Sequence, residues 1–214
     1  MLADREKKIP ARCNSNIKLK VIPGHFATTT SHINYYTDLS TLKARHAEAM
    51  EVATSMAHEY QYNTPVDTIV CINGTEVIGT CLAEKLTENG IMSLNRHNTM
   101  YIITPEFDIN GQLIFRDNMQ PMVRGKNVLL LLDAATTGQT ISKCLNTIKY
   151  YGGIIQGISA IFSAIPDIAG IQIHSIFSTA DIPDYQSFDS FDCPHCKAGE
   201  KIDAIVNVHG YSEL

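Results

Sequence analysis

No apolar run in the 214-residue chain is long enough to cross a membrane. One of the longest, Val128–Leu132, is far shorter than the ~18 apolar residues that a membrane-spanning helix needs. The first twenty residues mix acids and bases without an apolar core, so they do not resemble a secretory signal. We therefore expect a cytoplasmic protein without membrane association.

The chain also lacks an excess of positive charge. Its 17 Lys and Arg residues against 22 Asp and Glu residues give a formal net charge of −5. Such a surface does not attract a polymer of phosphates, which argues against nucleic acid as a partner. A small phosphorylated ligand stays open, because helix N-termini and backbone amides bind phosphate without net positive charge.

Internal repeats and low-complexity tracts are missing as well. Hydrophobic residues at 44% and charged residues at 18% are ordinary for a globular enzyme, and the length predicts one domain, or one with an appendage. Of the six cysteines, Cys71, Cys81 and Cys144 lie in apolar segments where buried free thiols are common. We therefore expect no disulfide framework.

Apolar periodicity alternates between strand and helix through the middle of the chain. Strands are predicted at residues 67–72, 99–104, 127–132, 154–165 and 171–177. Helices are predicted at 40–60, 77–86 and 141–148, the first of them as one long element with Asp38 or Ser40 as its N-cap. Strands that alternate with helices predict a mainly parallel sheet covered on both faces.

Two segments fall outside this alternation. Asn110-Gly111 lies between two short alternating runs, 106–109 and 112–115, and both turn positions of an Asn-Gly pair favour positive φ. We therefore predict a β-hairpin between the second and third strands. Beyond Asp181 the chain is rich in Asp, Pro and Ser, and we expect this tail to wrap over the surface.

The segment that carries chemistry follows the apolar strand that ends at Leu132. It consists of Asp133, Ala134, Ala135, Thr136, Thr137, Gly138, Gln139 and Thr140, and it opens into a helix. Small residues let backbone N–H groups approach an anion, hydroxyls add donors, and the helix N-terminus adds partial positive charge. This composition fits a 5′-phosphate site, with Asp133 placed to accept hydrogen bonds from ribose hydroxyls. The alternative is an ordinary turn with Thr136 or Thr137 as N-cap.

The stretch from Leu129 to Thr140 resembles the phosphoribosyl-pyrophosphate (PRPP) motif of the type I phosphoribosyltransferases. The usual motif has two acids, two small or apolar residues, Thr-Thr-Gly, any residue and Thr; here Leu132 stands at the first acidic position. Four more segments resemble orotate-type members in the same order: Thr30–Tyr36, Asn73–Glu76, Arg124–Lys126 and Cys193–Gly199. The resemblance covers residues 20 to 200.

The resemblance implies a fold, a reaction and partners. The fold is α/β, a mainly parallel twisted sheet flanked by helices, in a single domain 1–214 with a core over 40–180 and a hood from 1–39 and 181–214. The reaction is Mg²⁺-dependent transfer of ribose 5-phosphate from PRPP to orotate, in pyrimidine nucleotide biosynthesis, with release of pyrophosphate. A homodimer is also implied, since family members commonly share a mobile loop between subunits.

The same resemblance implies the site residues. PRPP would be bound by Asp133–Thr140, and pyrophosphate would face Asn73, Gly74 and Thr75. Ser31, His32, Tyr35 and Tyr36 would face the base. Asp133 and Arg116 are the implied catalytic residues. Because residues alternate along an extended segment, Tyr35 and Tyr36 should point opposite ways, one toward the base and one into the protein.

One departure bears on catalysis. Orotate-type members have a mobile loop rich in Lys, Arg and His between the strands that correspond to 99–104 and 127–132. Here residues 104–122 contain no Lys and no His, and Arg116 is their only cation. Each missing cation removes on the order of 3 kcal/mol of stabilisation from the departing pyrophosphate.

Two alternatives to the orotate enzyme therefore stay open. One is a purine-base salvage phosphoribosyltransferase, against which the orotate-like opening at 30–36 argues. The other is a non-catalytic PRPP- or nucleotide-binding regulatory homologue with a degenerate catalytic loop.

Cys193 and Cys196 form a single CxxC with His195 between them. A structural zinc site needs four ligands, and the missing two could come from His174 or His209 if either folded back. A redox dithiol is a second alternative, and the favoured one is a family-typical tail without metal. His25 and His32 lie beside turn residues near the implied base site, where a solvated or hydrogen-bonded histidine is the common case. We assign no metal ligand from the sequence.

Overall fold

The fold is described from a computed structural model that covers residues 2–29, 31–88, 94–95, 99–108 and 112–214. The chain folds into two compact units. Unit 1 comprises Met1–Thr41 and Thr179–Leu214, and unit 2 comprises Leu42–Ser178. The single domain inferred from the sequence stays a prediction. None of the helices in the described ranges has the length and apolar character to cross a membrane.

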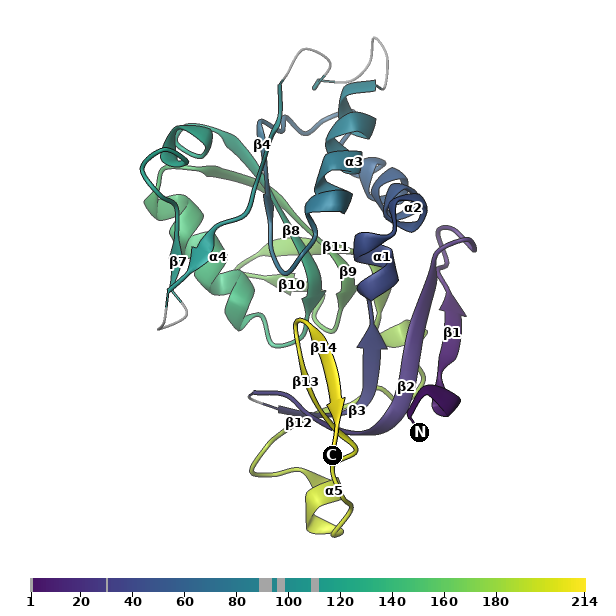
Figure 1. Ribbon diagram of the computed structural model, residues 1–214. Helices are drawn as coiled ribbons and strands as arrows, with labels where there is room; N and C mark the ends of the chain where they lie inside the picture. The colour runs from purple at the N-terminus through teal and green to yellow at the C-terminus, as the bar shows by residue number, and fades with distance from the viewer. Residues whose placement is uncertain (1, 30, 89–93, 96–98, 109–111) are drawn as a thin grey trace. The chain divides into compact units, whose positions relative to one another are not determined.

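Unit 2 is built on a six-stranded sheet in the order β10-β11-β9-β8-β4-β5 (Figure 1). The strands are β4 (Thr68–Cys71), β5 (Tyr101–Ile103), β8 (Asn127–Ala135), β9 (Ile154–Ser163), β10 (Asp167–Ile168) and β11 (Ile171–Ser178). Every neighbouring pair is parallel except β10 with β11. The predicted mainly parallel sheet is therefore confirmed, with β8 three residues longer than expected.

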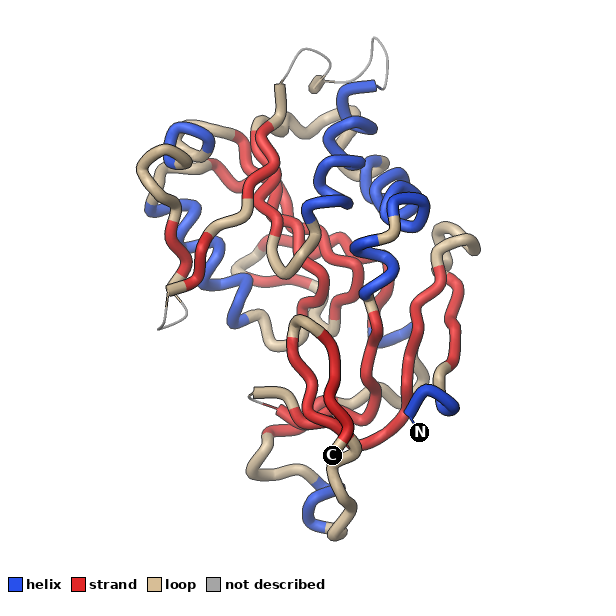
Figure 2. The backbone as a smooth tube through the Cα atoms, viewed as in Figure 1, coloured by secondary structure: helices blue, strands red, loops and turns tan. Residues whose placement is uncertain are grey.

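Helices cover both faces of this sheet, as Figure 2 shows. On one face, Leu130 and Leu132 of β8 share a buried cluster with Ile141 and Leu145 of α4 (Gln139–Tyr150). On the other, α3 (Glu76–Glu88) lies so close to β4 that a Cβ on Gly79 would stand 2.6 Å from the Cys71 sulfur. Glycine is therefore needed at this crossing, and the predicted two-sided cover is confirmed.

Residues 40–60 form two helices, so the prediction of one long helix is wrong. α1 (Ser40–Ala44) and α2 (His46–Ala57) are separated at Arg45, whose backbone is extended at φ −86° and ψ 113°. The Asp38 carboxylate accepts a 3.0 Å hydrogen bond from the Ser40 N–H at the start of α1. Periodicity did not indicate the break, because no residue near Arg45 is a glycine or proline.

The predicted hairpin is confirmed in its strands. β6 (Glu106–Phe107) pairs antiparallel with β7 (Leu113–Ile114), and the Asp108 N–H donates to the Gln112 carbonyl over 2.9 Å. The Asn110-Gly111 turn lies outside the described residues. Leu113 and Phe115 are buried in the same hydrophobic cluster as Ile141 and Leu145 of α4. A short 3₁₀ helix, η2 (Gln120–Met122), precedes β8.

Unit 1 is a second six-stranded sheet, in the order β12-β3-β2-β13-β14 with β1 also paired to β2. Its elements are η1 (Leu2–Arg5), β1 (Lys7–Pro10), β2 (Lys18–Ala27), β3 (Ser31–Asp38), η3 (Thr179–Asp181), β12 (Ser187–Asp189), α5 (Pro194–Lys197), β13 (Ala204–Asn207) and β14 (Gly210–Glu213). The expected surface tail therefore adds three strands to this sheet. Burial explains the difference, since Ala204 and Val206 of β13 pack with Ile22 and Phe26 of β2.

Candidate functional site

The connections that follow β4 and β8 leave the sheet in opposite directions. β4 leads through α3 to β5 on one side, whereas β8, its other neighbour, leads through α4 to β9. Such a switch point leaves a crevice at the carboxyl ends of the strands, where ligands of open α/β sheets bind. The Asn73–Thr75 turn and the Asp133–Thr140 segment both lie at this end.

Hydrogen bonds join these two segments. The Asn73 side-chain amide donates to Asp133 Oδ1 over 3.0 Å, and the Ala134 N–H donates to the same oxygen over 2.7 Å. The buried Thr75 hydroxyl donates to the Leu131 carbonyl over 3.2 Å. Asn73 and Gly74 both have positive φ, at 58° and 80°, which Asn and Gly tolerate best. Residues expected for pyrophosphate and for ribose are therefore neighbours.

Lys43 of α1 is a third member of this site, which the sequence did not reveal. Its ammonium donates to Asp133 Oδ2 over 3.0 Å and to the Asn73 carbonyl over 2.9 Å. The side chains of Lys43 and Asp133 are only 14% and 10% exposed, so the ion pair is largely withdrawn from water. The sequence signal was weak, because a single lysine on an amphipathic helix usually lies in solvent.

The N-terminus of α4 forms the open part of the site. Gly138 is its N-cap at φ 74°, and a Cβ there would stand 2.7 Å from Ile168 Cδ1. No side chain caps the helix, so the N–H groups of its first turn keep no side-chain partner. Thr136, Thr137 and Thr140 are exposed, and their hydroxyls bond to no other residue in the described ranges. The alternative in which Thr136 or Thr137 caps the helix is therefore wrong.

Arg116, the implied catalytic cation, is paired across the hairpin. Its Nε donates to Glu106 Oε2 over 2.9 Å, with 63% and 53% of the two side chains exposed. The hydrogen bond from Arg116 lowers the pKa of the Glu106 carboxyl below its ordinary value. A catalytic role for Arg116 stays a prediction.

The four residues expected for the base all belong to β3 of unit 1. Ser31 lies within 2.9 Å of the Thr28 hydroxyl, and Tyr36 is buried with its ring against Phe26 and Tyr211. Tyr35 is half-buried. His32 is 8% exposed and belongs to a different cluster, described below. The base-binding role of these residues stays a prediction.

That cluster is a group of side chains, found among the described residues of unit 1, that could hold a metal ion. Ligand atoms of His25, His32, Cys193 and Cys196 all lie within 4.8 Å of one another. The two histidines that the sequence suggested as partners of the CxxC do not belong to this group. His174 of unit 2 lies 3.4 Å from Glu59, and His209 lies in the turn between β13 and β14. Nothing in the sequence indicated that β2 and β3 lie beside the tail, so His25 and His32 were not predicted as metal-binding partners of the CxxC.

Comparison with known proteins found no matching family model and no matching curated protein. Solved structures do match. The orotate phosphoribosyltransferase of Mycobacterium tuberculosis H37Rv, in complex with Fe(III) dicitrate, superposes with a TM-score of 0.52 at 17% identity, over 77% of this chain and 93% of that one. The UMP synthase of Leishmania donovani gives a TM-score of 0.52 at 15% identity, over 75% of this chain and 34% of that longer one.

These matches, together with the sheet order and the loop after β8, define the class of fold. The chain has the fold of the type I phosphoribosyltransferases. Within that class, it is similar in fold to the mycobacterial orotate phosphoribosyltransferase over most of both chains.

Proposed function

We propose that this protein transfers ribose 5-phosphate from PRPP to a nucleobase, with orotate as the favoured acceptor. The observation that carries the proposal is the meeting of Asp133, Asn73 and Lys43 beside the uncapped N-terminus of α4. One end of this site offers donors to a phosphate, and the other offers a fixed carboxylate to a sugar. A ribose 5-phosphate presents both groups.

The 5′-phosphate binds at the start of α4. Exposed hydroxyls of Thr136, Thr137 and Thr140 donate to its oxygens, together with the free N–H groups of the first helical turn. Gly138 gives the backbone the positive φ that the turn into the helix requires. This arrangement needs no nearby lysine or arginine, which agrees with the modest number of cations in the chain.

Asp133 accepts hydrogen bonds from the ribose hydroxyls. Lys43 and Asn73 hold its two oxygens in place, so the carboxylate does not have to be ordered when substrate binds. Lys43 also contacts the Asn73 carbonyl, and so a cation stands beside the turn that we assign to pyrophosphate. We propose that Lys43 supplies part of the charge stabilisation that residues 104–122 lack.

Magnesium is the cofactor that this activity implies. Mg²⁺ prefers oxygen ligands and is often held mainly by substrate phosphates and water. Asp133 already accepts from Lys43, Asn73 and the Ala134 N–H, and the buried Leu132 offers no side-chain oxygen. These two positions do not fit a protein-held Mg²⁺. We therefore expect the ion to arrive bound to PRPP.

A second candidate function is a non-catalytic sensor of ribose phosphates. The observation that favours it is the ion pair of Arg116 with Glu106, which occupies the only Lys or Arg in residues 104–122. With this cation paired and Leu132 in place of an acid, the site would bind PRPP but would not stabilise the departure of pyrophosphate.

Calorimetry with PRPP, with and without Mg²⁺, followed by a pyrophosphate-release assay, distinguishes these functions. We expect PRPP binding, and pyrophosphate release when orotate is added. Release with adenine or another purine but not with orotate would indicate a salvage enzyme. Binding without turnover on any base would contradict catalysis and support the sensor, and no binding would contradict both.

The phosphate site is tested by replacing Thr137 and Thr140 with valine together. Both hydroxyls are exposed and bond to no other described residue, so we expect loss of PRPP binding with little change in stability. Thr80→Val is the matched control, because Thr80 is an exposed threonine on α3 that bonds only to the Glu76 carbonyl. Unchanged affinity in the double variant would mean that phosphate binds elsewhere.

A further inference from the structure

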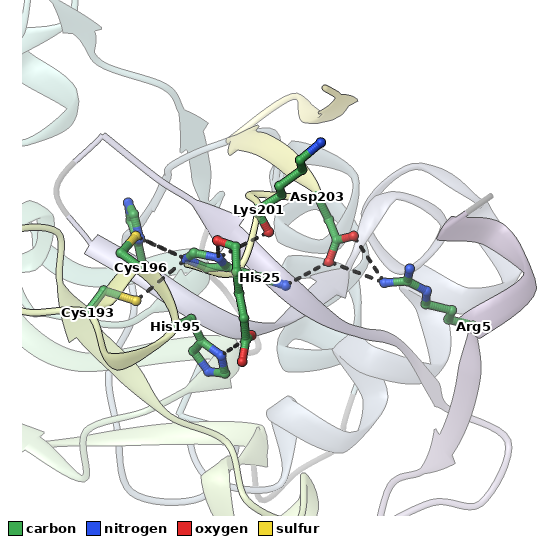
Figure 3. A network of polar contacts seen from close by, with 9 residues as sticks. Arg5, His25, Cys193, His195, Cys196, Lys201 and Asp203 are labelled. Carbon is green, nitrogen blue, oxygen red and sulfur yellow. Dashed lines mark hydrogen bonds and ion pairs between the residues drawn. The ribbon is translucent and has the colours of Figure 1, made fainter. Parts of the chain in front are cut away.

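Four potential metal ligands converge in unit 1 from three separate segments. His25 belongs to β2 and His32 to β3, whereas Cys193 is the N-cap of the single-turn helix α5 and Cys196 lies within it. Three of the four are nearly inaccessible to water, with His25, His32 and Cys193 only 3%, 8% and 1% exposed. Figure 3 shows both cysteine sulfurs directed at the His25 ring.

The spacing of the four ligand atoms fits one tetrahedral ion. Zn–S bonds of about 2.3 Å and Zn–N bonds of about 2.0–2.1 Å place sulfur about 3.5 Å from nitrogen, and nitrogen about 3.3 Å from nitrogen. His25 Nε2 lies 3.5 Å from Cys193 Sγ and 3.6 Å from Cys196 Sγ. Cys196 Sγ lies 3.3 Å from His32 Nδ1, and the two ring nitrogens are 3.0 Å apart.

Hydrogen bonds alone do not account for this convergence. His25 Nδ1 lies 3.2 Å from the carbonyls of both Glu200 and Lys201, so it must carry the proton as their donor. Nε2 is then left with a single lone pair, yet three ligand atoms surround it. A zinc-bound histidine commonly donates its second ring N–H to a backbone carbonyl in this way, which fixes the tautomer that binds metal.

Contacts around the cluster hold the His25 backbone in place. Asp203 accepts from the His25 N–H over 2.9 Å and pairs with Arg5 over 3.2 Å (Figure 3). Gly24 leaves room for this approach, since a Cβ there would stand 2.6 Å from Asp203 Oδ2 and would require that side chain to shift. His195, although it lies inside the CxxC, contacts Glu200 Oε2 over 2.6 Å and is not one of the four ligands.

We propose that His25, His32, Cys193 and Cys196 bind one structural Zn²⁺ ion in a closed Cys₂His₂ site. All four coordination positions are filled by side chains, which is typical of structural rather than catalytic zinc. The ion would join the tail to β2 and β3 across sequence separations of up to 171 residues. This proposal therefore replaces the interpretation favoured from the sequence, in which the tail binds no metal.

Metal analysis of the purified full-length protein tests the proposal directly. We expect about one zinc ion per chain in protein prepared without added metal. After chelation, titration with Co²⁺ should give the intense visible bands of a tetrahedral site and a thiolate-to-cobalt charge-transfer band. A zinc-free protein that takes up Co²⁺ without these bands, or one that contains a Cys193–Cys196 disulfide, would overturn the proposal.

Variants identify the ligands. Cys196→Ser and His32→Ala should reduce the zinc content to near zero, whereas His32→Cys should keep it because a thiolate replaces the imidazole. His195→Ala is the matched control and should keep both zinc and the cobalt spectrum. Zinc retained in both Cys196→Ser and His32→Ala, or lost in His195→Ala alone, would contradict the assignment. The cobalt titration of the unmodified chain still tests the proposal if a ligand variant does not fold.

Discussion

Lys43 and Asp133 form an ion pair that is mostly shielded from water, so removal of one partner leaves a charge without compensation. For Lys43→Met we expect the free energy of unfolding to fall by about 2 kcal/mol. We also expect weaker PRPP binding, because Asp133 loses one of the donors that orient it. Urea unfolding followed by circular dichroism measures the first effect, and calorimetry the second.

Lys149→Met provides the control, because Lys149 is exposed on α4 and should tolerate the same change. A double-mutant cycle with Asp133→Asn isolates the pair, and we expect a coupling of about 1–3 kcal/mol. A coupling near zero would show that the two side chains do not stabilise each other.

The buried thiols Cys71 and Cys144 should resist alkylation at pH 8. Burial raises the pKa of each to about 12, so the fraction of reactive thiolate at pH 8 is about 10⁻⁴. Cys13 is exposed and should react with iodoacetamide first. Peptide mapping by mass spectrometry gives the order of modification, and equally fast modification of Cys71 would contradict this burial. Cys193 and Cys196 should join the reactive thiols only after zinc is removed.

At the scale of elements, the start of α4 depends on one glycine. In Gly138→Ala an alanine must adopt a positive φ, and its Cβ clashes with Ile168. We expect the free energy of unfolding to fall by about 2–3 kcal/mol, and we also expect PRPP to bind more weakly. Gly125→Ala is the control, since its φ of 67° is similar but its Cβ would meet nothing within 4 Å. That variant should lose only about 1 kcal/mol, from backbone strain. Equal losses in the two variants would show that the contact with Ile168 is unimportant.

The sequence predicted those elements whose apolar pattern is local. The parallel strands, α3, α4 and the strands of the hairpin all follow from spacing within 10 to 20 residues. The break in the helix at Arg45 could not be predicted, because no local residue disfavours a helix there. The contacts that Lys43, just before the break, makes with Asn73 and Asp133 join segments that are distant in the sequence. For the same reason the sequence proposed Asp133 and Asn73 for the candidate site but did not include Lys43.

The tail shows the same limit. Its Asp, Pro and Ser content indicated a surface segment, yet β13 pairs parallel with β2 through Ala204 and Phe26. Composition carries no information about a partner so far away in the sequence. The zinc ligands were divided in the same way, with the CxxC visible in the tail and its two histidines in β2 and β3.

At the scale of the whole molecule, the two sheets should form at different times during refolding. Strand pairs of unit 2 such as Leu129 with Gly157 close short loops, whereas Ala204 pairs with Phe26 only after a much longer loop has closed. In pulse-labelling hydrogen exchange we expect the amides of β8 and β9 to be protected before those of β13. Simultaneous protection would indicate a single cooperative step.

The homodimer expected from the sequence is a separate proposal, tested by sedimentation.

The discontinuity of unit 1 has a consequence for biosynthesis. A ribosome that has translated through Ser178 has synthesised every residue of unit 2, but only the first of the two segments that make up unit 1. Until Ala204 emerges, β2 lacks the strand that pairs with its end, and until Cys193 and Cys196 emerge, His25 and His32 lack both cysteines. During translation, the nascent chain therefore exposes an unfinished sheet and half of a zinc site, to which chaperones or metal ions have access before the last residues are made.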